Sequence, residues 1–200
     1  MFKHIAVFIL ATFACVLGVS AQISVQAQQE ASFKKVDFLN YTYSSGICAS
    51  EFGMAKSIKV QNGSFKNDEF YFYIPDSKIV YGDVTGDKRT DAVVSIACGG
   101  NAGNFSLATI QIFMQSGGKE KLLATIDTHK LEADYKRYFP KGFIVGITKD
   151  GVKLRGTHIV IEAYTDGSNA SPKNIATFEY HMNFTKPVLG SKPRLRPSGI

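Results

Sequence analysis

The 200-residue chain has no tryptophan and only three cysteines, and it lacks the motifs of several enzyme classes. It contains no H-E-x-x-H or C-x-x-C spacing for zinc, no G-x-S-x-G nucleophile turn and no G-x-x-x-x-G-K-[ST] phosphate loop. S-x-x-K occurs at residues 32–35 and 116–119, but the S-D-N and K-T-G elements of penicillin-binding families are missing. These absences argue against zinc, phosphate-loop and serine-nucleophile chemistry.

No hydrophobic run long enough to span a membrane follows the first 21 residues, since such a span needs about 20 apolar residues. Residues 1–21 instead have a basic start, an apolar stretch and small residues before Gln22, which is the layout of a secretory signal peptide. A retained signal anchor is the alternative. The polar, Gln-rich residues 22–32 predict a flexible leader, and the expected location is periplasmic or extracellular.

Two cysteines, Cys48 and Cys98, remain after the signal peptide. In an oxidising compartment an isolated pair favours a disulfide, and a catalytic thiol at either position is the weaker reading. The sequence therefore predicts a Cys48–Cys98 bridge.

The formal charge of +6 is unevenly distributed. Of the 23 basic residues, Lys3 lies in the signal peptide and four lie in the last 15 residues, so the other 18 nearly balance the 17 acidic residues. Residues 186–200 therefore predict a basic, proline-containing tail outside a β-rich domain of residues 33–185. We expect this tail not to pack. It would either bind anionic surfaces or remain a solvated end, and no nucleic-acid partner is expected.

Period-two hydrophobicity dominates the predicted domain. Apolar residues alternate with polar ones over 176–184, and the continuous apolar run at 91–97 indicates a buried central strand. Turn dipeptides predict hairpins at residues 62–63, 116–119 and 150–151, and helical spacing predicts one helix over 128–140. The predicted fold is mainly β, a single antiparallel β-sheet or sandwich-like domain with one short helix.

One acidic loop, GDVTGDKRTDAVV, provides a candidate metal site. Numbered from Asp83, its oxygen donors fall at alternate positions, as calcium coordination by a tight loop requires. The candidate ligands are Asp83, Thr85, Asp87, the Arg89 carbonyl and Asp91. The loop is not an EF-hand, because position 12 is a valine rather than a bidentate glutamate.

This segment resembles the calcium loop of FG-GAP and VCBS-type repeats, D-x-[DN]-x-D-G-x-x-D followed by an apolar strand. The resemblance implies calcium as a cofactor, bound by Asp83, Asp87 and Asp91, while Thr85 and Lys88 depart from the pattern. The chain also resembles small exported bacterial proteins with one such segment, a resemblance that implies no activity. The alternative is a metal-free turn in which the aspartates accept hydrogen bonds from backbone N–H groups.

The sequence favours an exported, non-enzymatic β-rich binding or cell-envelope protein with a calcium-stabilised loop and an unidentified protein or polysaccharide partner. A hydrolase of envelope or extracellular polymers is one alternative, with a carboxylate pair as acid and base. An electrostatic binder that acts through the basic tail is another.

Overall fold

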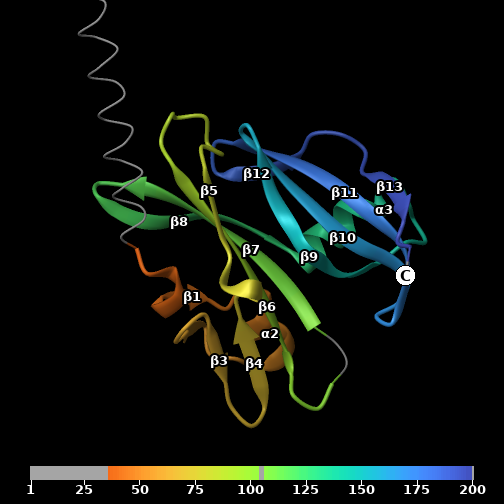
Figure 1. Ribbon diagram of the computed structural model, residues 1–200, viewed down its shortest axis with the longest axis horizontal. Helices are drawn as coiled ribbons and strands as arrows, with labels where there is room; N and C mark the ends of the chain where they lie inside the picture. Colours follow the sequence, from red (N-terminus) through yellow and green to blue (C-terminus); the bar gives the residue numbers. More distant parts are fainter. Residues whose placement is uncertain (1–35, 104–105, 200) are drawn as a thin grey trace, which may run out of the picture.

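The computed structural model describes residues 36–103 and 106–199, and it is mainly β with antiparallel sheets, as predicted. The predicted signal peptide and leader lie outside the described residues. Within them, no helix combines the length and apolar character needed to cross a membrane. Figure 1 shows two larger sheets packed together, with a small layer of N-terminal elements against the first of them.

The first sheet is built around one long central strand. Its strands run in the order β3-β4-β6-β7-β8. Strand β5 also pairs with β6, on the same edge as β4 and opposite to β7. The strands are β3 (Ser64–Lys66), β4 (Phe70–Tyr73), β5 (Ile79–Gly82), β6 (Asp91–Gly100), β7 (Ser106–Ser116) and β8 (Lys119–Asp127).

Both faces of β6 are buried, as its continuous apolar run predicts. Val94 and Ile96, with Cys98, belong to a core shared with the N-terminal layer, whereas Val93 faces a second core between the two sheets. The first sheet is therefore the middle layer of the molecule.

The second sheet has the order β12-β11-β10-β9, and β13 also pairs with β11. One edge of β11 pairs with β10, and the other is shared by two short strands in succession. The strands are β9 (Ile144–Arg155), β10 (His158–Ser168), β11 (Ser171–Asn183), β12 (Lys186–Leu189) and β13 (Arg194–Pro197).

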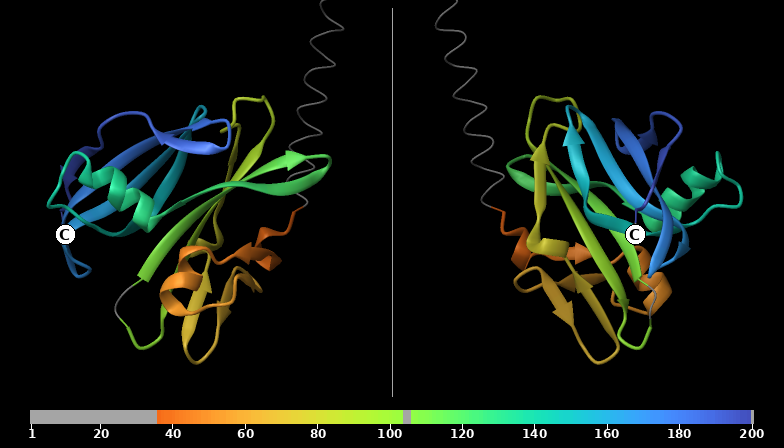
Figure 2. Two further views of the ribbon diagram at one scale, coloured as in Figure 1. Left: turned by 180° about the vertical axis from the view of Figure 1, so that it is seen from behind. Right: turned by 45° about the vertical axis from the view of Figure 1, so that its right-hand side comes forward.

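Helix α3 (Thr128–Lys136) closes the core between the sheets, and it confirms the predicted helix. Asp127 caps its N-terminus by accepting a 2.8 Å hydrogen bond from the Lys130 backbone N–H. Leu131 and Tyr135 face the second sheet's apolar strand residues. Seen from behind, in the left view of Figure 2, α3 lies in front of the second sheet, so the opposite face of that sheet is the outer one.

The N-terminal layer covers the other face of the first sheet, and helix α2 packs on β6 and β7. Helix α2 was not predicted; it has only six residues and ends at Gly53, where φ is +66°. The elements of this layer are the 3₁₀ turn η1 (Phe38–Asn40), β1 (Thr42–Ser44), α2 (Ile47–Phe52) and β2 (Ser57–Lys59).

The expectation that residues 186–200 do not pack is wrong, because two strands form there. Backbone pairing places Lys186 to Leu189 and Arg194 to Pro197 along β11. The prolines are tolerated because both strands lie at the sheet edge, where a missing N–H costs no ladder bond. The domain therefore extends beyond residue 185.

The predicted hairpin at Asp150-Gly151 is also wrong. Asp150 has a φ of +54°, but β9 continues through it as a bulge, and the actual hairpin joins Arg155 to His158. A Cβ on Gly151 would lie 2.6 Å from the Glu162 carbonyl oxygen, so the bulge requires glycine. The predicted turns at 62–63 and 116–119 are confirmed.

The alternation of buried and exposed side chains predicted over residues 176–184 is confirmed as far as the end of β11 at Asn183. Ala176, Phe178 and Tyr180 are fully buried in the core between the sheets. Phe184 is 91% exposed, because the chain turns there with a φ of +55° before β12 begins.

Candidate functional site

A cavity of about 410 Å³ lies between the two sheets, where the bulged strand β9 faces β5, β6 and β7. We call it the inter-sheet cleft. Its volume falls within the range of small-molecule sites. Its lining comes from β4 to β7, the turn before β5 and residues 146–152 of β9.

Small side chains on the first sheet leave this space open. Ala97 and Ala108 are direct cross-strand partners on β6 and β7, and Ser95 lies on the same face of β6. Beyond them the same face carries larger residues such as Val93 and Ile110, which fill the core. The cleft therefore lies at one end of the space between the sheets, beyond the last large side chains of the core.

An ion pair stands beside the cleft. Lys78 donates a 2.7 Å hydrogen bond from Nζ to Asp150 Oδ1, which joins the segment before β5 to the bulge of β9. The hydrogen bond from Lys78 and its positive charge lower the pKa of Asp150. Asp76, in the 3₁₀ turn η2 (Pro75–Ser77), also lines the cleft, and its φ of +53° is rare for a residue other than glycine.

The wall formed by β9 contributes an unsatisfied hydroxyl. Thr148 is buried, and its Oγ1 has no hydrogen-bond partner. Since a buried polar atom usually has a partner, Thr148 Oγ1 is a candidate donor and acceptor for a bound molecule. The cleft thus combines an apolar floor with hydroxyl and charged groups.

The aspartate loop, the predicted metal site, lies between β5 and β6 and is held by its own backbone. Asp83 accepts hydrogen bonds from the backbone N–H of Gly86 at 2.6 Å and of Lys88 at 2.9 Å. Asp87 accepts one from the Arg89 N–H at 2.8 Å. This is the pattern of the metal-free alternative.

Asp91 differs from the other two aspartates because it is only 1% exposed. Its Oδ2 accepts hydrogen bonds from the backbone N–H groups of Val84 and Thr85 at 2.9 and 3.0 Å, whereas Oδ1 has no partner. Burial raises the pKa of Asp91 from 3.8 to about 6, against the lowering effect of its hydrogen bonds.

The donor set for calcium is only partly assembled. Asp91 Oδ1 and Thr85 Oγ1 are buried oxygens that make no hydrogen bond of normal geometry, although the Thr85 side chain helps to lower the pKa of Asp91. Among the residues that the structure describes, however, no three histidine, cysteine, aspartate or glutamate side chains form a group that could hold a metal ion. Coordination by Asp83, Asp87 and Asp91 together would require the loop to change shape.

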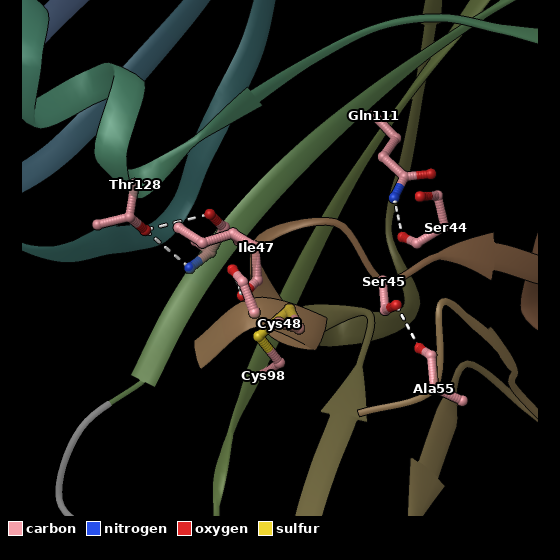
Figure 3. The surroundings of a disulfide bond; sticks show 10 residues. Ser44, Ser45, Ile47, Cys48, Ala55, Cys98, Gln111 and Thr128 are labelled. Atoms are coloured by element: carbon pink, nitrogen blue, oxygen red, sulfur yellow. Dashed lines mark hydrogen bonds between the residues drawn. A yellow bond between two sulfur atoms is a disulfide. The ribbon is translucent and has the colours of Figure 1, made fainter. Parts of the chain in front are cut away.

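The predicted disulfide is present: Cys48 and Cys98 are joined, with 6.1 Å between their Cα atoms. Figure 3 shows the bridge linking α2 to β6, below Ile47 and to the left of the hydrogen bond between Ser45 and Ala55. Nearby, Gln111 Nε2 donates a 2.6 Å hydrogen bond to the Ser44 carbonyl oxygen. Both cysteines are fully buried, so the bridge is a structural tie between layers.

Comparison of the chain with protein-family models, curated proteins and solved structures finds no match. The resemblance to FG-GAP and VCBS loops therefore rests on the loop residues themselves.

The inter-sheet cleft was not predicted from the sequence, because its lining residues carry no motif. One signal was present, however. In the run DAVVSIACGG, valine, serine and alanine succeed one another on one face at positions 93, 95 and 97. A buried strand whose side chains become small on one face indicates space or close approach there.

Proposed function

We propose that the chain is an exported binding protein whose ligand occupies the inter-sheet cleft. The observation that carries this proposal is the cavity of about 410 Å³ floored by Ala97 and Ala108 and rimmed by hydroxyl and charged groups. Such a lining suits a small molecule with an apolar body and a few polar groups. The buried disulfide is compatible with export, because disulfides persist in oxidising compartments.

The ionisation of Asp150 argues against a role for this residue as the general acid of a hydrolase. A general acid at neutral pH needs a raised pKa, whereas pairing with Lys78 lowers that of Asp150. Asp150 therefore remains an ionised partner of Lys78 rather than a proton donor. The hydrolase alternative would require a different carboxylate pair.

Filling the cleft tests the proposal. With the amphiphilic anionic dye 8-anilinonaphthalene-1-sulfonate as probe, we expect fluorescence enhancement that falls several-fold in an Ala108→Phe variant, because the ring occupies the floor of the cavity. The measurement is a dye titration at neutral pH, with circular dichroism to verify folding.

The matched control is Ala170→Phe, which adds the same ring at an exposed turn between β10 and β11. Equal enhancement in wild type and Ala108→Phe would contradict the cleft as a binding site, and so would an equal loss in both variants.

Calcium stabilisation of the aspartate loop is a second proposal, supported by the unpartnered Asp91 Oδ1 and Thr85 Oγ1. A bound ion would be held by oxygens of Asp83, Thr85, Asp87 and Asp91 with the Arg89 carbonyl. The bound ion would neutralise the negative charge of the buried Asp91 carboxylate.

Thermal unfolding in excess calcium and in chelator tests this second proposal. A ligand at 100 times its Kd stabilises the folded state by about 2.7 kcal/mol, which raises Tm by several degrees. We expect Asp87→Ala to abolish the rise, while Asp68→Ala, an exposed acidic residue outside the loop, keeps it. Identical Tm values of the wild type with and without calcium would leave the loop a metal-free turn.

A further inference from the structure

A second surface, on the outer face of the second sheet, brings together four basic side chains. A groove of about 290 Å³ runs over β10 and β11 there. We call it the basic groove. It is lined by Lys153, Arg155, Val160, Glu162, Thr177, Arg194, Leu195 and Arg196.

Its two walls come from distant parts of the sequence. Lys153 and Arg155 project from β9, and Arg194 and Arg196 project from β13, on the far side of β10 and β11. Three strand spacings, about 14 Å, separate the strands that carry the walls, but the long basic side chains reach toward one another over β10 and β11. Because strand pairing fixes β13, the basic residues of the C-terminal segment have a defined position rather than a solvated one.

The cations outnumber the acids that they contact. Glu179 Oε1 lies 2.9 Å from an Arg155 nitrogen and 2.6 Å from an Arg194 nitrogen. Glu162 lies 3.7 Å from Lys153 and 3.5 Å from Arg196. Each carboxylate is thus shared by two cations, which leaves the groove with two uncompensated positive charges.

The cationic side chains remain accessible although they are paired. Those of Lys153, Arg155, Arg194 and Arg196 are 54–66% exposed. A guanidinium has five N–H donors and each contacts a carboxylate through one nitrogen, so donors remain for a further oxyanion. The floor adds the Thr177 hydroxyl and the apolar Val160.

We propose that the basic groove binds an extended acidic polysaccharide. The four cations form two rows across β10 and β11, Lys153 with Arg196 and Arg155 with Arg194, and a linear polyanion that lies over these rows would meet each in turn. The hydroxyl and apolar floor fits sugar rings better than a bare inorganic polyanion. This surface is opposite to the face that lines the inter-sheet cleft, so the inference stands apart from the proposed function.

Binding of fluorescein-labelled heparin, measured by anisotropy across a salt titration, tests the proposal. We expect affinity that falls with salt and that weakens roughly tenfold or more in Arg194→Gln/Arg196→Gln, because two charge-assisted contacts are lost. The matched control, Lys59→Gln/Lys66→Gln, removes the same charge from exposed positions in β2 and β3 and should stay within about twofold of wild type.

A third variant, Glu162→Gln/Glu179→Gln, separates binding from a structural role. Removal of the competing carboxylates should tighten heparin binding, whereas a purely structural ion-pair network would lose stability with no gain in affinity. If Arg194→Gln/Arg196→Gln does not fold, Lys153→Gln/Arg155→Gln tests the opposite wall.

Three results would overturn the proposal. The first is an absence of heparin binding at low salt. The second is an equal loss in the groove and control variants, which would indicate diffuse charge attraction. The third is equal affinity for single-stranded DNA of the same length and charge, which would show a general polyanion surface rather than a polysaccharide site. If heparin binds specifically, the affinity for alginate shows which anionic group the groove recognises, because alginate carries carboxylates and no sulfates.

Discussion

Replacing Cys48 and Cys98 with alanine is expected to lower the free energy of unfolding by about 4 kcal/mol. The bridge closes a loop with a sequence separation of 50, and its loss restores conformational freedom to the unfolded chain. For a domain of this size the change corresponds to a fall in Tm of roughly 10 °C. Because the bridge joins α2 to β6, the N-terminal layer should loosen first.

Chemical denaturation of the wild type with and without reductant, beside the double alanine variant, measures the effect. Alanine keeps the buried site apolar, so the comparison mainly reports the cross-link. The variant should not respond to reductant. An unchanged midpoint on reduction of the wild type would mean that core packing alone holds α2 in place.

The second large effect is expected at Asp91. Its pKa is raised from 3.8 to about 6 in the folded protein, so the folded state favours the protonated carboxyl. Stability contributed by this group is therefore complete below the unfolded-state pKa and is lost as pH rises through about 6. This rise in the pKa corresponds to roughly 3 kcal/mol in the free energy of unfolding.

An Asp91→Asn variant exposes this dependence. The amide stays neutral and keeps one oxygen for the Val84 and Thr85 N–H groups. Relative to wild type, the variant should gain roughly 3 kcal/mol between about pH 3.5 and pH 7.5, measured by urea denaturation in chelator. A constant difference between Asp91→Asn and wild type would show that Asp91 is not desolvated.

The mainly β fold class could be predicted because the local sequence patterns that indicate strands and turns agree with the long-range packing. Alternation in β11, the apolar run of β6 and the Asn62-Gly63 turn each depend on neighbouring residues, and each is confirmed. The disulfide was also predictable, because only two cysteines follow the predicted signal peptide.

The errors concern features that only long-range pairing decides. Asp150-Gly151 has the chemistry of a turn, but pairing with β10 makes it a bulge. The C-terminal segment has the composition of a loose tail, yet the free edge of β11 accepts it as two strands. The cleft depends on the bulge and the basic groove depends on the C-terminal strands, so the sequence alone did not reveal either surface.

Strand β9 serves both surfaces at once. Thr148 and Gly151 line the inter-sheet cleft, whereas Lys153 and Arg155, two to four residues farther along, form one wall of the basic groove. A molecule that shifts this strand from one side changes the geometry offered on the other. Thermodynamic linkage makes such an effect mutual: if a cleft ligand raises the affinity of the groove, occupancy of the groove raises the affinity of the cleft by the same factor.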